Sequence, residues 1–160
     1  MSDAEVIQVP NMLKLRMGSR FGGGLNAVAL AKAEAALKSL SGQFGQWLED
    51  ELKKLEGAGA AVRNLGMTQA TGEALYTSAH DLKGLGTTYE YPIITRMAGL
   101  LCKLIETPDL RAKAPLRLID VHIDAIRAAV RDNIHDVSHP TGKMIVDELE
   151  QQVTEHLSGR

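Results

Sequence analysis

Apolar residues recur at steps of three and four along most of the chain, which is the spacing of one buried face of an α-helix. The longest such stretch runs from Leu25 to about Asn64, and Gly42 and Gly45 could kink it. Its expected buried positions are Leu37, Leu40, Phe44, Trp47 or Leu48, Leu52 and Leu55. No stretch of useful length alternates with period two, so the pattern predicts an all-α fold.

Four breaks divide the rest of the chain into further helices. The first offers Thr68 as an N-cap for a helix that reaches about Tyr89. Proline then favours helix starts at Pro92 and Pro115, and residues 139–142 precede a last helix. The expected core positions of these three helices are Ile94, Met97, Leu101, Leu104, Leu116, Ile119, Ile123, Ile126, Val130, Met144, Ile145, Leu149 and Val153.

These helices predict an all-α bundle over residues 25–160, up-and-down with short connections. Residues 1–24 form a separate N-terminal segment, in which a short helix could begin at Pro10. Gly22-Gly23-Gly24 separates this segment from the bundle, because three glycines lose much backbone entropy in a helix. With 160 residues the chain is long enough for one hydrophobic core, so we expect a monomer that builds its bundle alone.

Charge and composition argue against several classes of function. The net charge is −2 and no basic stripe is visible, so a nucleic-acid partner is not expected. Cys102 is the only cysteine, which excludes an intrachain disulfide and a cysteine-based metal site. No run approaches the roughly 18 apolar residues that a membrane-spanning helix needs. The N-terminus lacks the pattern of a secretory signal, so the expected location is the cytoplasm, without membrane contact.

One helix face carries the candidate chemistry. Leu75 and Leu82 mark the inward side of the second helix, and His80 lies roughly 140–160° away from both. We therefore expect its imidazole, which can act as a neutral nucleophile near neutral pH, to face solvent. Lys83, at i+3, could offset the charge of a phosphoryl group on that ring. Gly84, at i+4, leaves space beside the ring, although glycine costs roughly 1 kcal/mol of helix stability relative to alanine.

The order His80-x-Leu82-Lys83-Gly84, followed by the apolar pattern of residues 97–106, resembles histidine-containing phosphotransfer domains. The resemblance is sharp over residues 75–106 and only architectural elsewhere. It implies that His80 is the phosphoacceptor, that Lys83 is its charge-compensating neighbour and that Gly84 is the clearance position.

The resemblance also implies an up-and-down four-helix bundle with additional N- and C-terminal helices. The helix that carries His80 and the helix after it would form half of this bundle, and the helices over residues 25–64 and 115–134 could supply the other half.

Two positions depart from the family pattern. Glu90 stands where the family usually has a glycine, ten residues after the histidine, and Leu85-Gly86 replaces a pair of small polar residues. The first departure concerns how the helix ends, which Tyr91-Pro92 can also bring about. Neither departure alters the His-Lys-Gly pattern, so we interpret the site as intact.

The resemblance implies a phosphorelay intermediate of two-component signal transduction, which shuttles a phosphoryl group between receiver-domain aspartates through phosphohistidine. Its expected partners are response-regulator receiver domains, a hybrid histidine kinase, or both. The receiver would hold Mg²⁺, and this chain would need no cofactor or metal of its own. The chain has no GxxxxGKS loop, so no kinase or ATPase activity is expected. Docking contacts are expected from Tyr76, Ala79, Thr87 and Thr88.

Other interpretations fit some of the same residues. A helical adaptor could use the His-Lys-Gly surface to bind a partner without phosphate chemistry. A phosphoacceptor module detached from a histidine kinase would dimerise by pairing two helical hairpins. His135 and His139 are spaced like a metal-binding pair, but they lie in an expected loop with Asp136 as the only obvious third ligand. We interpret His122 and His156 as structural or exposed, and Cys102 as a core residue.

Overall fold

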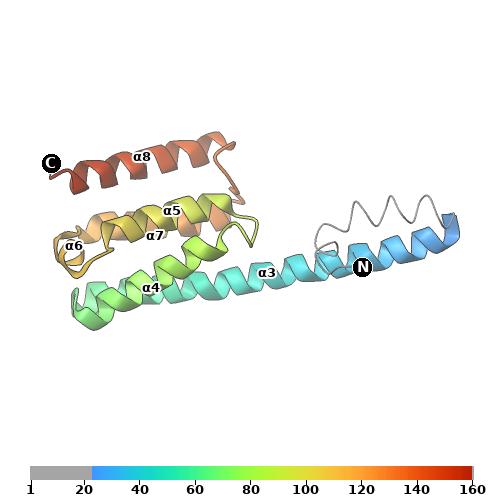
Figure 1. Cartoon of the computed structure of the whole chain (residues 1–160), viewed down its shortest axis with the longest axis horizontal. Coiled ribbons are helices and arrows are strands. Elements are labelled where there is room, and N and C mark those ends of the chain that lie inside the picture. Colours follow the sequence, from blue (N-terminus) through green and yellow to red (C-terminus); the bar gives the residue numbers. More distant parts are fainter. Residues whose placement is uncertain (1–22, 160) are drawn as a thin grey trace. The chain divides into compact units, whose positions relative to one another are not determined.

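Helices account for most of the described chain in a computed structural model of the protein. The structure describes residues 23–159, with side chains from residue 26. Its helices, labelled as in Figure 1, are α3 (Gly23–Leu65), α4 (Gln69–Leu85), α5 (Pro92–Leu104), α6 (Pro108–Lys113), α7 (Leu116–Arg131) and α8 (Pro140–Leu157). These residues contain no strand, which confirms the predicted all-α fold for this part of the chain. None of these helices is long and apolar enough to cross a membrane.

Helix boundaries coincide with residues whose chemistry starts or stops a helix. The Thr68 hydroxyl accepts a hydrogen bond from the Thr71 N–H, and the Thr71 hydroxyl accepts one from the Thr68 N–H, which caps α4. Prolines occupy the first turns of α5, α6 and α8. Two predictions were wrong in detail. α4 ends at Leu85 rather than near Tyr89, and the short helix α6 was not predicted.

The chain divides into two compact units, residues 1–46 and residues 47–160, so α3 contributes to both. In the described part of the first unit, Leu37 and Leu40 have exposed fractions of 41% and 43%. The prediction that these two side chains line a core is therefore wrong. The helix expected from Pro10 lies outside the described residues.

α5 is central to the core of the second unit. It packs against α4, α7 and α8, and α7 also contacts α8 (Figure 1). The buried side chains of α5 include all four of its predicted core positions, Ile94, Met97, Leu101 and Leu104. The second part of α3 contributes Leu48, Leu52, Leu55 and Val62 to the same core. Two positions predicted as buried, Leu116 and Met144, are exposed.

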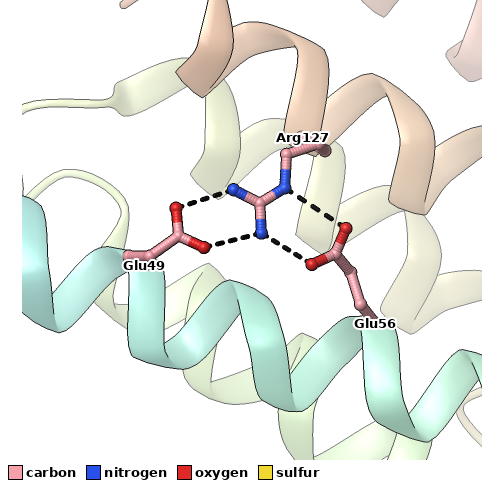
Figure 2. A network of polar contacts seen from close by, with 3 residues as sticks. All are labelled: Glu49, Glu56 and Arg127. Carbon is pink, nitrogen blue, oxygen red and sulfur yellow. Dashed lines mark hydrogen bonds and ion pairs between the residues drawn. The ribbon is translucent and has the colours of Figure 1, made fainter.

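A guanidinium group joins the second part of α3 to α7. Figure 2 shows Arg127 of α7 between Glu49 and Glu56 of α3. Its Nη1 and Nη2 donate to the two Glu49 oxygens at 2.7 and 2.8 Å, and its Nη2 and Nε donate to Glu56 at 2.6 and 3.2 Å. The hydrogen bonds to Arg127 lower the pKa of the Glu49 carboxyl. One cation therefore compensates two carboxylates at this helix contact.

Replacing Arg127 by methionine should lower the free energy of unfolding by about 1–2 kcal/mol, because the two carboxylates then face each other without a cation. The loss should shrink at high salt, which screens partly exposed charges. Urea denaturation at low and high ionic strength measures both effects. Arg131→Met is the matched control, since Arg131 forms an ion pair with its exposed neighbour Asp132 and with no other described residue, and it should leave unfolding unchanged. Equal losses of unfolding free energy in the two variants would contradict a stabilising role for the Arg127 ion pairs.

His122 of α7 is fully buried in the core. Its Nδ1 donates to the Leu118 carbonyl at 2.7 Å, which leaves Nε2 buried without a hydrogen-bond partner among the described residues. Burial lowers the pKa of the imidazole, and the bond to Leu118 opposes this only in part. The ring is therefore neutral in the folded protein near neutral pH.

The free energy of unfolding should fall as the pH is lowered from 7 to 5. In that window the unfolded chain protonates His122 near its ordinary pKa of 6.5 while the folded chain does not, so acid favours unfolding. One such group contributes a slope of up to about 1.4 kcal/mol per pH unit. Denaturation at several pH values should show a smaller slope for His122→Met than for the wild type. An identical slope would show that His122 is not the cause.

Candidate functional site

His80 lies on the outer face of α4, and the packing of this helix explains why. Leu75, Ala79 and Leu82 of α4 are fully buried against the core, which turns the opposite side of the helix to solvent. His80 is exposed, as its angular position predicts, and its ring makes no hydrogen bond to another described residue. The imidazole nitrogens are therefore accessible to a partner.

Tyr76, His80 and Gly84 follow one another at four-residue spacing along this face, and Gly72, one turn before Tyr76, is buried. A methyl group placed on Gly84 would meet no atom within 4 Å, so packing does not require glycine there. Gly86 is different, because a methyl group on it would lie 2.7 Å from the backbone nitrogen of Thr95. The fold therefore explains Gly86 but not Gly84, the residue one turn from His80.

The Lys83 side chain lies along α5. A methyl group on Gly99 would sit 3.8 Å from Lys83 Cδ and 3.9 Å from its Cε. Burial raises the pKa of the nearby Cys102 thiol to about 11, and the positive charge of Lys83 lowers it by a smaller amount. Within the described residues, no carboxylate forms an ion pair with the Lys83 ammonium. This cation is exposed and available to an incoming anion.

Sequence reasoning missed one residue near the site. Arg111 of α6 places its guanidinium carbon 5.2 Å from the centroid of the Tyr76 ring, and the Tyr76 and His80 ring centroids are 5.8 Å apart. Arg111 is far from His80 in the sequence and lies on a helix that the pattern did not predict. The only sequence signal was Gly72, whose missing side chain makes room for Arg111.

The expected docking residues have different environments. Ala79 is fully buried, so the prediction that its side chain contacts a partner is wrong. Tyr76 is half-buried, and Thr87 and Thr88 are exposed. The Thr87 N–H donates to the Thr95 hydroxyl at 3.0 Å, which ties the end of α4 to α5. Tyr76, Thr87 and Thr88 therefore remain on the accessible surface around His80.

Glu90 has a positive φ of 69°. This left-handed conformation favours glycine over residues with a side chain. Its carbonyl lies 2.6 Å from His135 Nδ1, and the His135 ring stacks on Tyr91 with centroids 4.0 Å apart. The backbone thus takes the turn that a glycine would favour, and contacts from the α7–α8 connection hold it.

The described residues contain no group of three or more histidine, cysteine or acidic side chains that could hold a metal ion. His135 bonds to the Glu90 carbonyl, while His139 Nδ1 accepts from the Thr141 N–H and caps α8. A hollow of about 550 Å³ lies between α7 and α8, lined in part by Leu118, Val121 and Leu149, and α4 contributes nothing to it. His80 therefore lies on an open surface rather than in this hollow.

Comparisons with protein-family models, with curated proteins and with solved structures find no match to this chain. The functional assignment therefore depends on the residues around His80 and on their geometry.

Proposed function

We propose that this chain is a histidine phosphotransfer protein that carries a phosphoryl group on His80 between receiver-domain aspartates of a cytoplasmic two-component phosphorelay. The observation that supports this most is the exposed His80 ring on a helix whose other side is fixed in the core. A nucleophile held this way is open to the active site of another protein. The partners would be receiver domains, a hybrid histidine kinase, or both.

In the proposed reaction, the lone pair on Nε2 of neutral His80 attacks the phosphorus of a receiver's phospho-aspartate. The new N–P bond forms as the bond between phosphorus and the aspartate oxygen breaks, and the carboxylate leaves with that electron pair. The proton on Nδ1 stays on the ring. Transfer to a second receiver reverses these steps. Mg²⁺ on the receiver would stabilise the transferred group, so this chain acts as a carrier without kinase or ATPase activity.

Lys83 and Gly84, one helical turn after His80, support this proposal in two different ways. The Lys83 ammonium is exposed and pairs with no carboxylate among the described residues, so it can move toward a phosphoryl group on His80. The open space over Gly84 leaves room for the receiver's aspartate loop. Glycine at this exposed helix position costs stability that packing does not demand, which favours a role in access.

We also propose that the four bundle helices of the family correspond to residues 47–65 of α3 together with α4, α5 and α7, and that α8 is an additional C-terminal helix. The buried leucines of α3 and the Arg127 contact support the first assignment. The packing of α5 on α4 and α7 supports the others. Such a bundle would be complete within one chain, so the proposal includes a monomer.

The dimerising alternative has one observation in its favour, the exposed apolar side chains of Val28, Leu37 and Leu40 on α3. Light scattering on the full chain separates the two states. A monomer agrees with a phosphotransfer protein that builds its own bundle, and a stable dimer favours a module of the kind that histidine kinases use.

The proposed function is tested by incubating the purified chain with a set of phosphorylated receiver domains. The expected result is a phosphoryl group on the chain that is labile in acid and stable in base, as a phosphoramidate linkage is, and that maps to His80 by mass spectrometry. Absence of transfer from every receiver, combined with partner binding that leaves His80 unmodified, would favour the helical adaptor instead.

A further inference from the structure

We propose that Arg111 is a positioning residue for His80 and that it acts through the ring of Tyr76. The proposal rests on the phosphotransfer function of His80. Arg111 does not touch His80, so its role would be to limit the orientations of the imidazole rather than to contact the phosphoryl group.

Arg111 is fixed by contacts on three sides. Its Nε donates to the Ile105 carbonyl at 2.9 Å, at the point where the chain leaves α5. Its stem lies against Gly72, where an added methyl group would come within 3.0 Å of Arg111 Cδ. Its guanidinium lies over the Tyr76 ring, in the geometry of a cation–π contact. No carboxylate among the described residues pairs with Arg111, so no ion pair draws the guanidinium away from this ring.

Tyr76 passes this constraint to His80. The two residues are one helical turn apart, and their rings meet with centroids 5.8 Å apart and planes inclined by 34°. An exposed histidine on a helix has about two common χ1 wells and two broad χ2 orientations, or about four arrangements of its ring. Contact with one face of a fixed Tyr76 ring favours the arrangement seen here.

The count of arrangements gives the size of the effect. If a receiver reacts with one arrangement of the imidazole, releasing the ring into about four should lower the transfer rate by up to about four-fold. In Arg111 variants the loss should appear in kcat rather than in KM, because Arg111 is not among the expected docking residues; Tyr76 is, so its variants should raise KM as well. Variants of Arg111 and Tyr76 should lose the same factor in kcat, and the double variant no more, since both act on one contact.

The test uses the full chain with two donors: phosphoramidate, which is too small to dock, and a phosphorylated receiver. Phosphorylation is measured at His80 itself by mass spectrometry. Arg111→Gln should slow transfer from the receiver by up to about four-fold with KM unchanged, and Tyr76→Leu should lower kcat by the same factor. Neither variant should slow the reaction with phosphoramidate, which can approach the imidazole in any of its arrangements. Arg96→Gln is the matched control, because Arg96 pairs with Glu150 of α8 and should change neither rate. An unchanged receiver rate in Arg111→Gln, an equal loss with phosphoramidate, or a rise in KM alone would overturn the proposal.

A second measurement needs no phosphate. The χ1 coupling constants of His80, measured by NMR, should report one dominant rotamer in the wild type and in Tyr76→Phe, which keeps the ring. They should become averaged in Arg111→Gln and in Tyr76→Leu, while the helical signal stays constant. If no receiver phosphorylates the wild type, the proposed function fails, and these couplings still decide whether Arg111 orients His80. Averaged couplings in the wild type would overturn the positioning role.

Discussion

A His80→Gln variant is expected to accept no phosphoryl group from any receiver, while its helical content and unfolding midpoint match those of the wild type. The glutamine amide nitrogen shares its lone pair with the carbonyl and is not a nucleophile, so the covalent step has no acceptor. His80 is exposed and makes no hydrogen bond to another described residue, so the exchange should change the free energy of unfolding by less than about 0.5 kcal/mol. Phosphate transfer and circular dichroism measure the two quantities on the same samples.

The matched control for this variant is His156→Gln. His156 is partly exposed on α8, on the rim of the α7–α8 hollow, and α4 does not contribute to that hollow. The control should retain full transfer. If His80→Gln were still phosphorylated at another histidine, the phosphoacceptor would be that histidine and not His80. Equal losses of transfer in both variants would show that neither loss is caused by removing one particular imidazole.

The outward position of His80 could be predicted from the sequence because it depends only on helix geometry and on two neighbours. Leu75 and Leu82 are large apolar residues on one side of α4, and both are fully buried. Their burial fixes the rotation of the helix, and this places His80 at the surface. The buried positions of α5 were also predictable from helix geometry. Pro92 fixes where the helix begins, and the apolar residues that follow recur at helical spacing.

The contact between Arg111, Tyr76 and His80 could not be predicted in this way. It joins two elements far apart in the sequence, and α6 has only six residues, too few for a periodic pattern to show. The prediction that Leu37 and Leu40 are buried was wrong for a related reason. Their spacing continues that of the buried leucines farther along α3, but periodicity shows only which face is apolar and not whether another element covers it.

The end of α4 was missed because proline at position 92 only sets a limit beyond which a helix cannot continue. The observed end at Leu85 lies beside a contact between helices: Gly86 keeps α-helical angles, but it lies so close to Thr95 and Tyr91 that only a residue without a side chain fits. A close approach of this kind depends on the packing of α4 on α5, and the local pattern of apolar residues does not contain it.

Placing alanine at Gly86 should therefore be strongly destabilising, whereas the same change two residues earlier should be stabilising. A methyl group on Gly86 would lie 2.7 Å from the Thr95 nitrogen and 2.9 Å from the Tyr91 carbonyl oxygen, and neither backbone atom can move without shifting a helix. The expected cost is about 2–3 kcal/mol, which corresponds to a fall in Tm of roughly 5–10 °C for a chain of this length. A methyl group on Gly84 would meet nothing within 4 Å, so Gly84→Ala should gain about 0.5–1 kcal/mol of helix stability.

A helix can contain glycine because packing leaves no room for a side chain, as at Gly86, or because a partner needs access, as proposed for Gly84. Thermal unfolding of the two alanine variants measures the difference in stability between these cases. If Gly84 is present for access to His80, then Gly84→Gln, which adds a long side chain with good helix propensity, should be at least as stable as the wild type and yet slow phosphotransfer. A receiver must bring its aspartate loop into the space that this side chain would fill. If a stable Gly84→Gln variant transferred phosphate at the wild-type rate, access to His80 would not explain this glycine. If the variant were stable but slow, Gly84 would lower the stability of α4 and raise the rate of phosphotransfer at His80.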